Sequence, residues 1–218
     1  MSIGIDNALK RLCSGAALGV LHYKAMVAPS SQAQRMEFDR KLAQLQGDTL
    51  LEDVAKDPHI AATREAYKAL GKNPKEYRNA AEAMLRRIIK GQGLYYINNV
   101  VEVNNLISVS SGYSIGSYDI SDLHGDIMLR RADEGLHYEG IGKGSVNIGC
   151  LPVLFDDDGA FGNPTSDSRR AMIQEGRREI YSIFYAFDGP VGLGPWMEKF
   201  CQLLERFCDV HGVERWTV

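Results

Sequence analysis

The sequence predicts an α/β protein of the α+β type, in which mixed and antiparallel strands pack beside helices. Of its 218 residues, 44% are hydrophobic and 24% are charged, a globular composition that is long enough for one continuous core. Up to about residue 110, apolar residues recur mostly at helical spacing. Beyond that point, short β-like runs follow one another between glycine-rich turns, which is typical of hairpin-connected strands.

The first part of the chain is predicted to hold one strand followed by helices. LGVLHYKAMV, residues 18–27, partly alternates between apolar and polar residues, as a half-buried strand does. Amphipathic helices are then expected over residues 31–45, 58–70 and 80–90, each ended by a following glycine.

Residues 98–110 fit either a buried strand by composition or a helix by their i, i+3, i+4 spacing. We predict a helix, because the segment is too long for a typical strand and two adjacent asparagines, Asn104 and Asn105, interrupt it. After this segment, strands are expected over residues 113–118, 126–131, 136–138, 147–155 and 179–187, then a helix over 196–210 and a last strand over 214–218.

The charge balance limits the partners that the chain can bind. Lys and Arg number 25 against 28 Asp and Glu, so the net charge of −3 lacks the basic excess of a sequence-independent nucleic-acid binder. Any RNA contact must therefore be local. The four cysteines form no CxxC pair, and no apolar run reaches the length of a signal peptide or a membrane span. We expect a cytoplasmic protein without membrane contact.

Neither a cofactor nor a metal is expected. The glycine-rich segment 140–145 departs from a phosphate-binding loop, because His137 stands where the first glycine would be and Gly144 where a Ser or Thr would follow the lysine. The acidic run 156–158 lacks the later ligands of a calcium loop, and Asp158-Gly159 is a good hairpin turn instead. The five histidines show no HxxxH or HxH spacing.

Two polar segments point to a binding pocket. EVNNLISVSSGYSIGSYD, residues 102–119, runs from the predicted helix through a glycine turn into a strand. GNPTSDSRR, residues 162–170, combines hydroxyls, an amide, a carboxylate and two guanidiniums. By themselves the Asn, Pro, Ser and Asp of the second segment favour a local turn, but Arg169 and Arg170 directly after it shift the balance towards a ligand site.

These segments, together with REAYKALGKNPKEYRNAAEAMLRRIIKG at residues 64–91, resemble the B3/B4 domain of the phenylalanyl-tRNA synthetase β subunit, and more closely the free-standing B3/B4-domain proteins. INNVVEVNN matches the helix of that domain, GYSIGSYD its glycine turn and strand, and GAFGNPTSDSRR the hydroxyl-rich loop of the free-standing proteins. The resemblance implies a single B3/B4-like domain over residues 1–218, with its best-matched core at about 64–187 and an N-terminal helical extension at about 28–60.

In the synthetase this domain removes tyrosine mistakenly attached to the phenylalanine tRNA. The resemblance therefore implies a free-standing tRNA-editing domain, an aminoacyl-tRNA deacylase that hydrolyses mischarged aminoacyl-tRNA in trans and binds the tRNA acceptor end, and not DNA. Two alternatives stay open: a non-catalytic tRNA-binding or RNA-binding module, and a protein that binds a free amino acid or another small molecule. A complete synthetase is excluded, because the chain lacks the length and any ATP-binding motif.

The resemblance also assigns site residues. Asn105 takes the asparagine position of the helix motif, Glu102 replaces its usual aspartate, and Gly116 stands where synthetases often carry histidine. The acidic residue of the synthetase loop falls near residues 165–167. The predicted catalytic residues are Asp167, Thr165, Ser166 and Asn105; the predicted substrate-binding residues are Asn104, Gly116, Ser117 and Glu102; and the predicted tRNA-binding residues are Arg86, Arg169 and Arg170.

The assigned roles follow from the chemistry of an aminoacyl ester, which is already activated and needs only an oriented water and a stabilised oxyanion. Asp167 is expected to orient water or the substrate ammonium group. Thr165 and Ser166 are expected to contact water or the oxyanion, and Asn105 to recognise the amino acid or the terminal adenosine. Arg170 and Arg86 are expected to attract acceptor-end phosphates.

Overall fold

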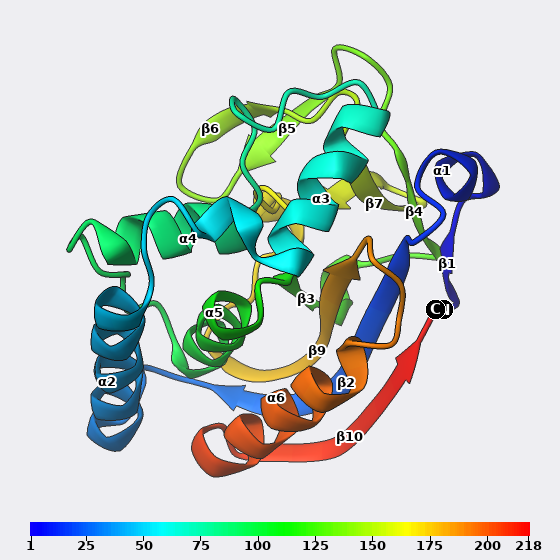
Figure 1. The fold of residues 1–218 in the computed structure, drawn as a ribbon. Coiled ribbons are helices and arrows are strands. Elements are labelled where there is room, and N and C mark those ends of the chain that lie inside the picture. The colour runs from blue at the N-terminus through cyan, green and yellow to red at the C-terminus, as the bar shows by residue number, and fades with distance from the viewer.

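The order of strands and helices confirms the predicted α/β architecture. The computed structural model describes residues 1–218 and has two four-stranded sheets, a two-stranded hairpin and six α-helices (Figure 1). The helices are α1 Asn7–Leu12, α2 Gln32–Asp48, α3 Pro58–Ala69, α4 Ala80–Ile89, α5 Asn99–Ser111 and α6 Leu193–Phe207, with short 3-10 turns at Val54–Lys56, Ile120–Asp122 and Arg169–Ala171. The strands are β1 Ile3–Ile5, β2 Ala17–Val27, β3 Ser114–Asp119, β4 Ile127–Arg131, β5 His137–Gly140, β6 Gly144–Asn147, β7 Pro152–Asp156, β8 Gly159–Gly162, β9 Gly176–Ala186 and β10 Val210–Thr217.

The first sheet is antiparallel, with strand order β10-β2-β9-β3. Its centre is the pair β2 and β9, which stay in register from Ala17 opposite Ala186 to Val27 opposite Gly176. β3 pairs only with β9 within this sheet and lies at its edge.

The second sheet is mixed, with strand order β1-β4-β7-β8. β1 runs parallel to β4, and the other neighbours are antiparallel. β5 and β6 form a separate hairpin. None of the helices is both long and apolar enough to cross a membrane.

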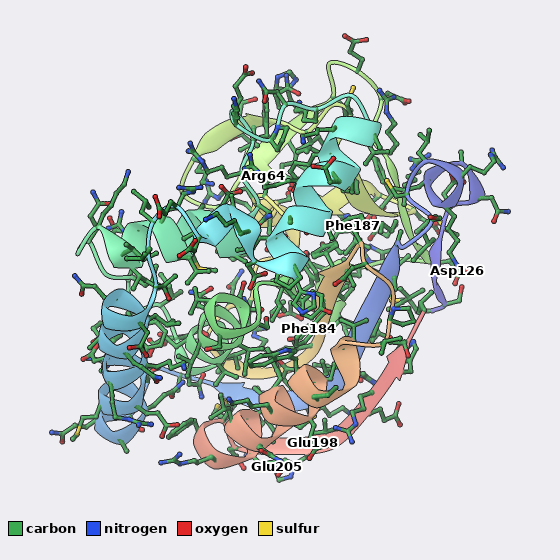
Figure 2. All side chains as sticks on the ribbon, viewed as in Figure 1. Arg64, Asp126, Phe184, Phe187, Glu198 and Glu205 are labelled. Carbon is green, nitrogen blue, oxygen red and sulfur yellow. The ribbon has the colours of Figure 1, made fainter.

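Two apolar clusters hold these layers together. On one face of the first sheet, Tyr23 and Phe184 pack against the apolar faces of α5 and α6, which lie over this sheet in Figure 1; Phe184 is labelled in Figure 2. Phe38 and Leu42 of α2 join the same cluster, so the segment at about 28–60 packs on the core. On the other face, side chains of β2, β3 and β9 share a second cluster with those of β1, β4, β7 and β8.

The predicted helix at 98–110 is confirmed as α5, and local chemistry explains both of its ends. The Asn98 side chain accepts a hydrogen bond from the Val101 amide at the N-terminus. Gly112 ends the helix with a φ of 80°, a conformation that glycine adopts without strain.

One predicted strand is wrong. Residues 147–155 are not one strand, because a turn between Ile148 and Leu151 separates the end of β6 from β7, with Cys150 at a φ of 65°. The alternation of apolar residues continues across this turn, so periodicity alone did not reveal it. β1 and α1 were not predicted, and neither was β8, which lies inside the segment expected to be a polar loop.

Candidate functional site

The strand β3 divides the predicted site residues into two groups. Successive side chains of a strand point to opposite faces, so Ser117 and Tyr118 point away from each other. Ser117 bonds to Asn104 of α5, whereas Tyr118 bonds to Asp167 in the loop after β8. No side-chain hydrogen bond joins the two groups.

The helix-side group is a chain of hydrogen bonds on the α5 face of the first sheet. Ser117 Oγ donates to Asn104 Oδ1 at 3.0 Å, and lies 2.7 Å from Ser182 Oγ. Asn104 Nδ2 in turn donates to the Ile115 carbonyl at 3.2 Å, which anchors α5 to β3. Asn105, beside Asn104, is partly exposed, and so is Ser117, so these two residues are the accessible polar groups of this side.

Asn163 shapes the loop that carries the other group. Its Oδ1 accepts hydrogen bonds from the backbone N–H groups of Thr165, at 2.7 Å, and Ser166, at 3.1 Å. This is the local turn chemistry of asparagine. Its Nδ2 donates to the Tyr138 hydroxyl at 2.6 Å, and Tyr138 donates to the Ser166 carbonyl. Hydrogen bonds of the Asn163 and Tyr138 side chains therefore fix the conformation of the loop that carries Asp167.

The two loop hydroxyls differ in their contacts. Thr165 Oγ1 lies 2.7 Å from the Tyr67 hydroxyl of α3. Ser166 Oγ makes no hydrogen bond within the protein, and the residue is partly exposed. Ser166 therefore offers the freer hydroxyl to a ligand.

Asp167 is the carboxyl at the centre of the loop group. The Tyr118 hydroxyl donates to its Oδ1 at 2.7 Å, and the Tyr185 hydroxyl lies 2.7 Å from that of Tyr118. Because Tyr118 uses its only proton on Asp167, Tyr185 donates to Tyr118. Burial raises the pKa of Asp167 to about 7, although the bond from Tyr118 acts against the shift. Part of the residue still reaches solvent.

Two glycines allow Tyr118 to reach Asp167. A Cβ atom on Gly116 would stand 1.9 Å from the Tyr118 hydroxyl oxygen, and one on Gly162 would stand 2.2 Å from it. The Tyr118 hydroxyl thus lies against the backbone of β3 and of β8. Gly116 was predicted to bind the substrate, but the Tyr118 side chain fills the space next to it.

We predict that Gly116→Ala lowers the free energy of unfolding by about 1–3 kcal/mol, because its methyl group must displace the Tyr118 ring. Urea denaturation measures the change. Gly47→Ala in α2 is the control, because a Cβ at Gly47 would meet no atom within 4 Å. Equal stabilities of the two variants would contradict the close approach.

Glu102, another residue assigned to the substrate, is buried. It is 1% exposed, and neither of its carboxylate oxygens has a hydrogen-bond partner. With Gln34, Phe38 and Phe207 it lines a cavity of about 10 Å³ under α2. Burial raises the pKa of its carboxyl. Glu102 therefore faces the interior and is not presented to a ligand at the surface.

The three arginines assigned to tRNA have different surroundings. Arg170 donates hydrogen bonds to both carboxylate oxygens of Asp156, at 2.6 and 3.1 Å, and to the carbonyls of Asp122 and Gly159. Its guanidinium therefore stabilises the fold through contacts within the protein. Arg86 donates to Glu82 at 2.9 Å and to a backbone carbonyl at 3.3 Å. Arg169 is exposed and makes no side-chain bond.

Sequence reasoning missed the tyrosines that surround the loop. They are Tyr67, Tyr118, Tyr138 and Tyr185. Tyr118 lay inside GYSIGSYD and Tyr67 inside the segment at residues 64–91, but neither was assigned a role in the site. The four tyrosines come from α3, β3, β5 and β9, and nothing in their local sequence marks them as neighbours of Asp167.

The fold and the site define a mixed α/β domain whose polar loop holds a partly exposed carboxyl against an edge strand. The chain belongs to the B3/4 domain family, whose model matches residues 62–191.

Among solved structures, the chain is similar to an N-terminal fragment of the phenylalanyl-tRNA synthetase β-subunit from Pyrococcus horikoshii, with 11% identity and a TM-score of 0.45. The match covers 96% of this chain and 50% of the fragment, so this chain spans about half the fragment's length. No curated protein matches the sequence.

Proposed function

We propose that this protein is an aminoacyl-tRNA deacylase that acts in trans on mischarged tRNA. The observation that carries the proposal is Asp167, a partly exposed carboxyl with a pKa of about 7 in the loop that also carries the Ser166 hydroxyl. A group that ionises near neutral pH is suited to take up and return a proton. Membership of the B3/4 family and the resemblance to an editing domain support the same substrate class.

In the proposed reaction, ionised Asp167 accepts a proton from a water molecule while the water oxygen attacks the ester carbonyl carbon. Ser166 donates a hydrogen bond to the developing oxyanion. The bond between that carbon and the ribose oxygen then breaks, and Asp167 returns the proton to the departing ribose oxygen. The products are the free amino acid and uncharged tRNA.

The hydrogen-bond pattern around Asp167 supports this role. Tyr118 binds Oδ1, and no side chain donates to Oδ2. Tyr118 thus holds the carboxyl in one orientation, and we assign to Oδ2 the contact with the attacking water. Asn105 lies on the other side of β3, and we assign to it a contact with the amino acid or the terminal adenosine.

We predict that Asp167→Asn lowers the deacylation rate by about 10²- to 10⁴-fold, since the amide cannot accept the proton. A panel of mischarged and correctly charged tRNAs measures the rate and identifies the amino acid removed. The wild-type rate should fall as the pH decreases below about 7, because Asp167 becomes protonated. Asp48→Asn, at an exposed position of α2, is the control.

Asn105→Ala is expected to reduce the same rate through weaker binding of the substrate. Unchanged rates in both Asp167→Asn and Asn105→Ala would overturn the assignment of these residues.

One observation favours a second candidate, a non-catalytic RNA-binding module. Thr165 Oγ1 and Asp167 Oδ1 already bond to Tyr67 and Tyr118, so part of the loop is satisfied within the protein. Such a module would bind tRNA with a marked salt dependence and release no amino acid from any member of the panel.

A further inference from the structure

Three large hydrophobic residues in a row stand out from the surface between α4 and α5. Tyr95 is 68% exposed, Tyr96 43% and Ile97 57%. They belong to a segment without regular secondary structure that follows Gly91 and Gly93, which have φ angles of 72° and 59°. Consecutive exposed residues of this kind indicate a surface that a partner covers.

Arginines hold both tyrosine rings in place. The Arg87 guanidinium carbon lies 4.6 Å from the centre of the Tyr95 ring, and that of Arg35 lies 5.0 Å from the centre of the Tyr96 ring. Arg87 Nε also donates to the Gly93 carbonyl at 2.8 Å, and the Tyr96 hydroxyl donates to Asp39. Exposed aromatic rings next to cations are the chemistry that stacks nucleobases and attracts their phosphates.

Helix α4 connects this surface to the Asp167 loop. At its N-terminus, the Ala80 amide donates to the Pro164 carbonyl at 2.7 Å, next to the loop hydroxyls. Ala83, Arg87 and Lys90 follow at helical spacing on one side, and Ala83 and Lys90 are exposed. The ten residues of α4 span about 15 Å. This side of α4 thus carries alanines near the Asp167 loop and the cations Arg87 and Lys90 near Tyr95.

We propose that Tyr95 and Tyr96, with Arg87 and Lys90, form a stacking site for single-stranded RNA. The site takes the unpaired 3′ end of a tRNA, which runs along α4 so that its terminal ester reaches the Asp167 loop; this course of the strand rests on the proposed function. The cations Arg87 and Lys90 argue against an apolar protein partner. Such a partner would bury both cations against apolar groups, at a large desolvation cost.

The test is the binding of a short labelled single-stranded RNA that ends in CCA, followed by fluorescence anisotropy. Tyr95→Leu should weaken binding about 5- to 150-fold, and Tyr95→Trp should retain it, because stacking requires an aromatic ring. An apolar protein contact would tolerate leucine. Trp216→Leu on β10 is the matched control, because Trp216 is also exposed, at 36%, but lies on a different element.

Lys90→Gln should lower the slope of log K against log salt concentration by about 0.7, the value for one phosphate contact on a single strand. The RNA carries no ester, so this result is independent of hydrolysis. Loss of RNA binding in Tyr95→Leu without deacylation in the wild type would support the stacking site and refute the deacylase. Equal affinities of Tyr95→Leu and wild type, or no RNA binding by the wild type, would overturn the stacking site.

Discussion

Asp167→Asn is expected to be more stable than the wild type above about pH 7, although it removes the proposed catalytic group. An aspartate has a pKa of about 3.9 in an unfolded chain, and burial raises that of Asp167 to about 7. Between these values the folded protein binds more protons than the unfolded one, so the free energy of unfolding falls as the pH rises. Three pKa units correspond to about 4 kcal/mol, an upper limit because part of Asp167 reaches solvent.

Urea denaturation of the variant and the wild type at about pH 5 and about pH 8 measures this effect. The advantage of Asp167→Asn should grow between the two values, because asparagine keeps an acceptor for Tyr118 and does not ionise. Asp48→Asn, whose side chain lies at the surface, should follow the wild type at both values. A stability difference that is the same at both pH values would show that Asp167 has an ordinary pKa.

Glu82→Ala is expected to lower the free energy of unfolding by about 3–5 kcal/mol, the effect of removing one partner from a buried ion pair. The Glu82 side chain is fully buried in α4. It accepts hydrogen bonds from Arg64 of α3 at 2.9 and 3.0 Å and from Arg86 at 2.9 Å. Without it, two partly buried guanidiniums lose their counter-charge.

Thermal unfolding tests this prediction, because a loss of 1 kcal/mol lowers Tm by roughly 2–4 °C in a domain of this size. Glu65→Ala is the matched control: Glu65 pairs with Lys68 on α3, but its side chain is 70% exposed, and such pairs contribute little. Similar Tm values for the two variants would show that the Glu82 cluster does not hold α4. The position of α4 also bears on the Asp167 loop, since the Ala80 amide at the start of α4 donates a hydrogen bond to the Pro164 carbonyl.

The local sequence was enough to predict the elements whose ends are chemically marked. Asn98 and Gly112 cap α5, which was predicted. β8 was not predicted, although Gly159, with a φ of 117°, starts it directly after a two-residue turn. The motifs in residues 64–170 were likewise enough to predict the family, because their spacing along the chain is itself the signal. The prediction of one strand over residues 147–155 was wrong, because apolar residues continue to alternate through the turn at Cys150.

The sequence by itself therefore determined the fold class, the family and the polar loop around Asp167. Only the tertiary structure decided what each polar residue does. It places Tyr118 between Gly116 and Gly162, buries Glu102 and occupies Arg170 with Asp156. The physical reason is that burial, close approach and ion pairing depend on residues far apart in the chain, and a pKa of about 7 at Asp167 exists only where the folded protein removes part of the hydration of its carboxyl.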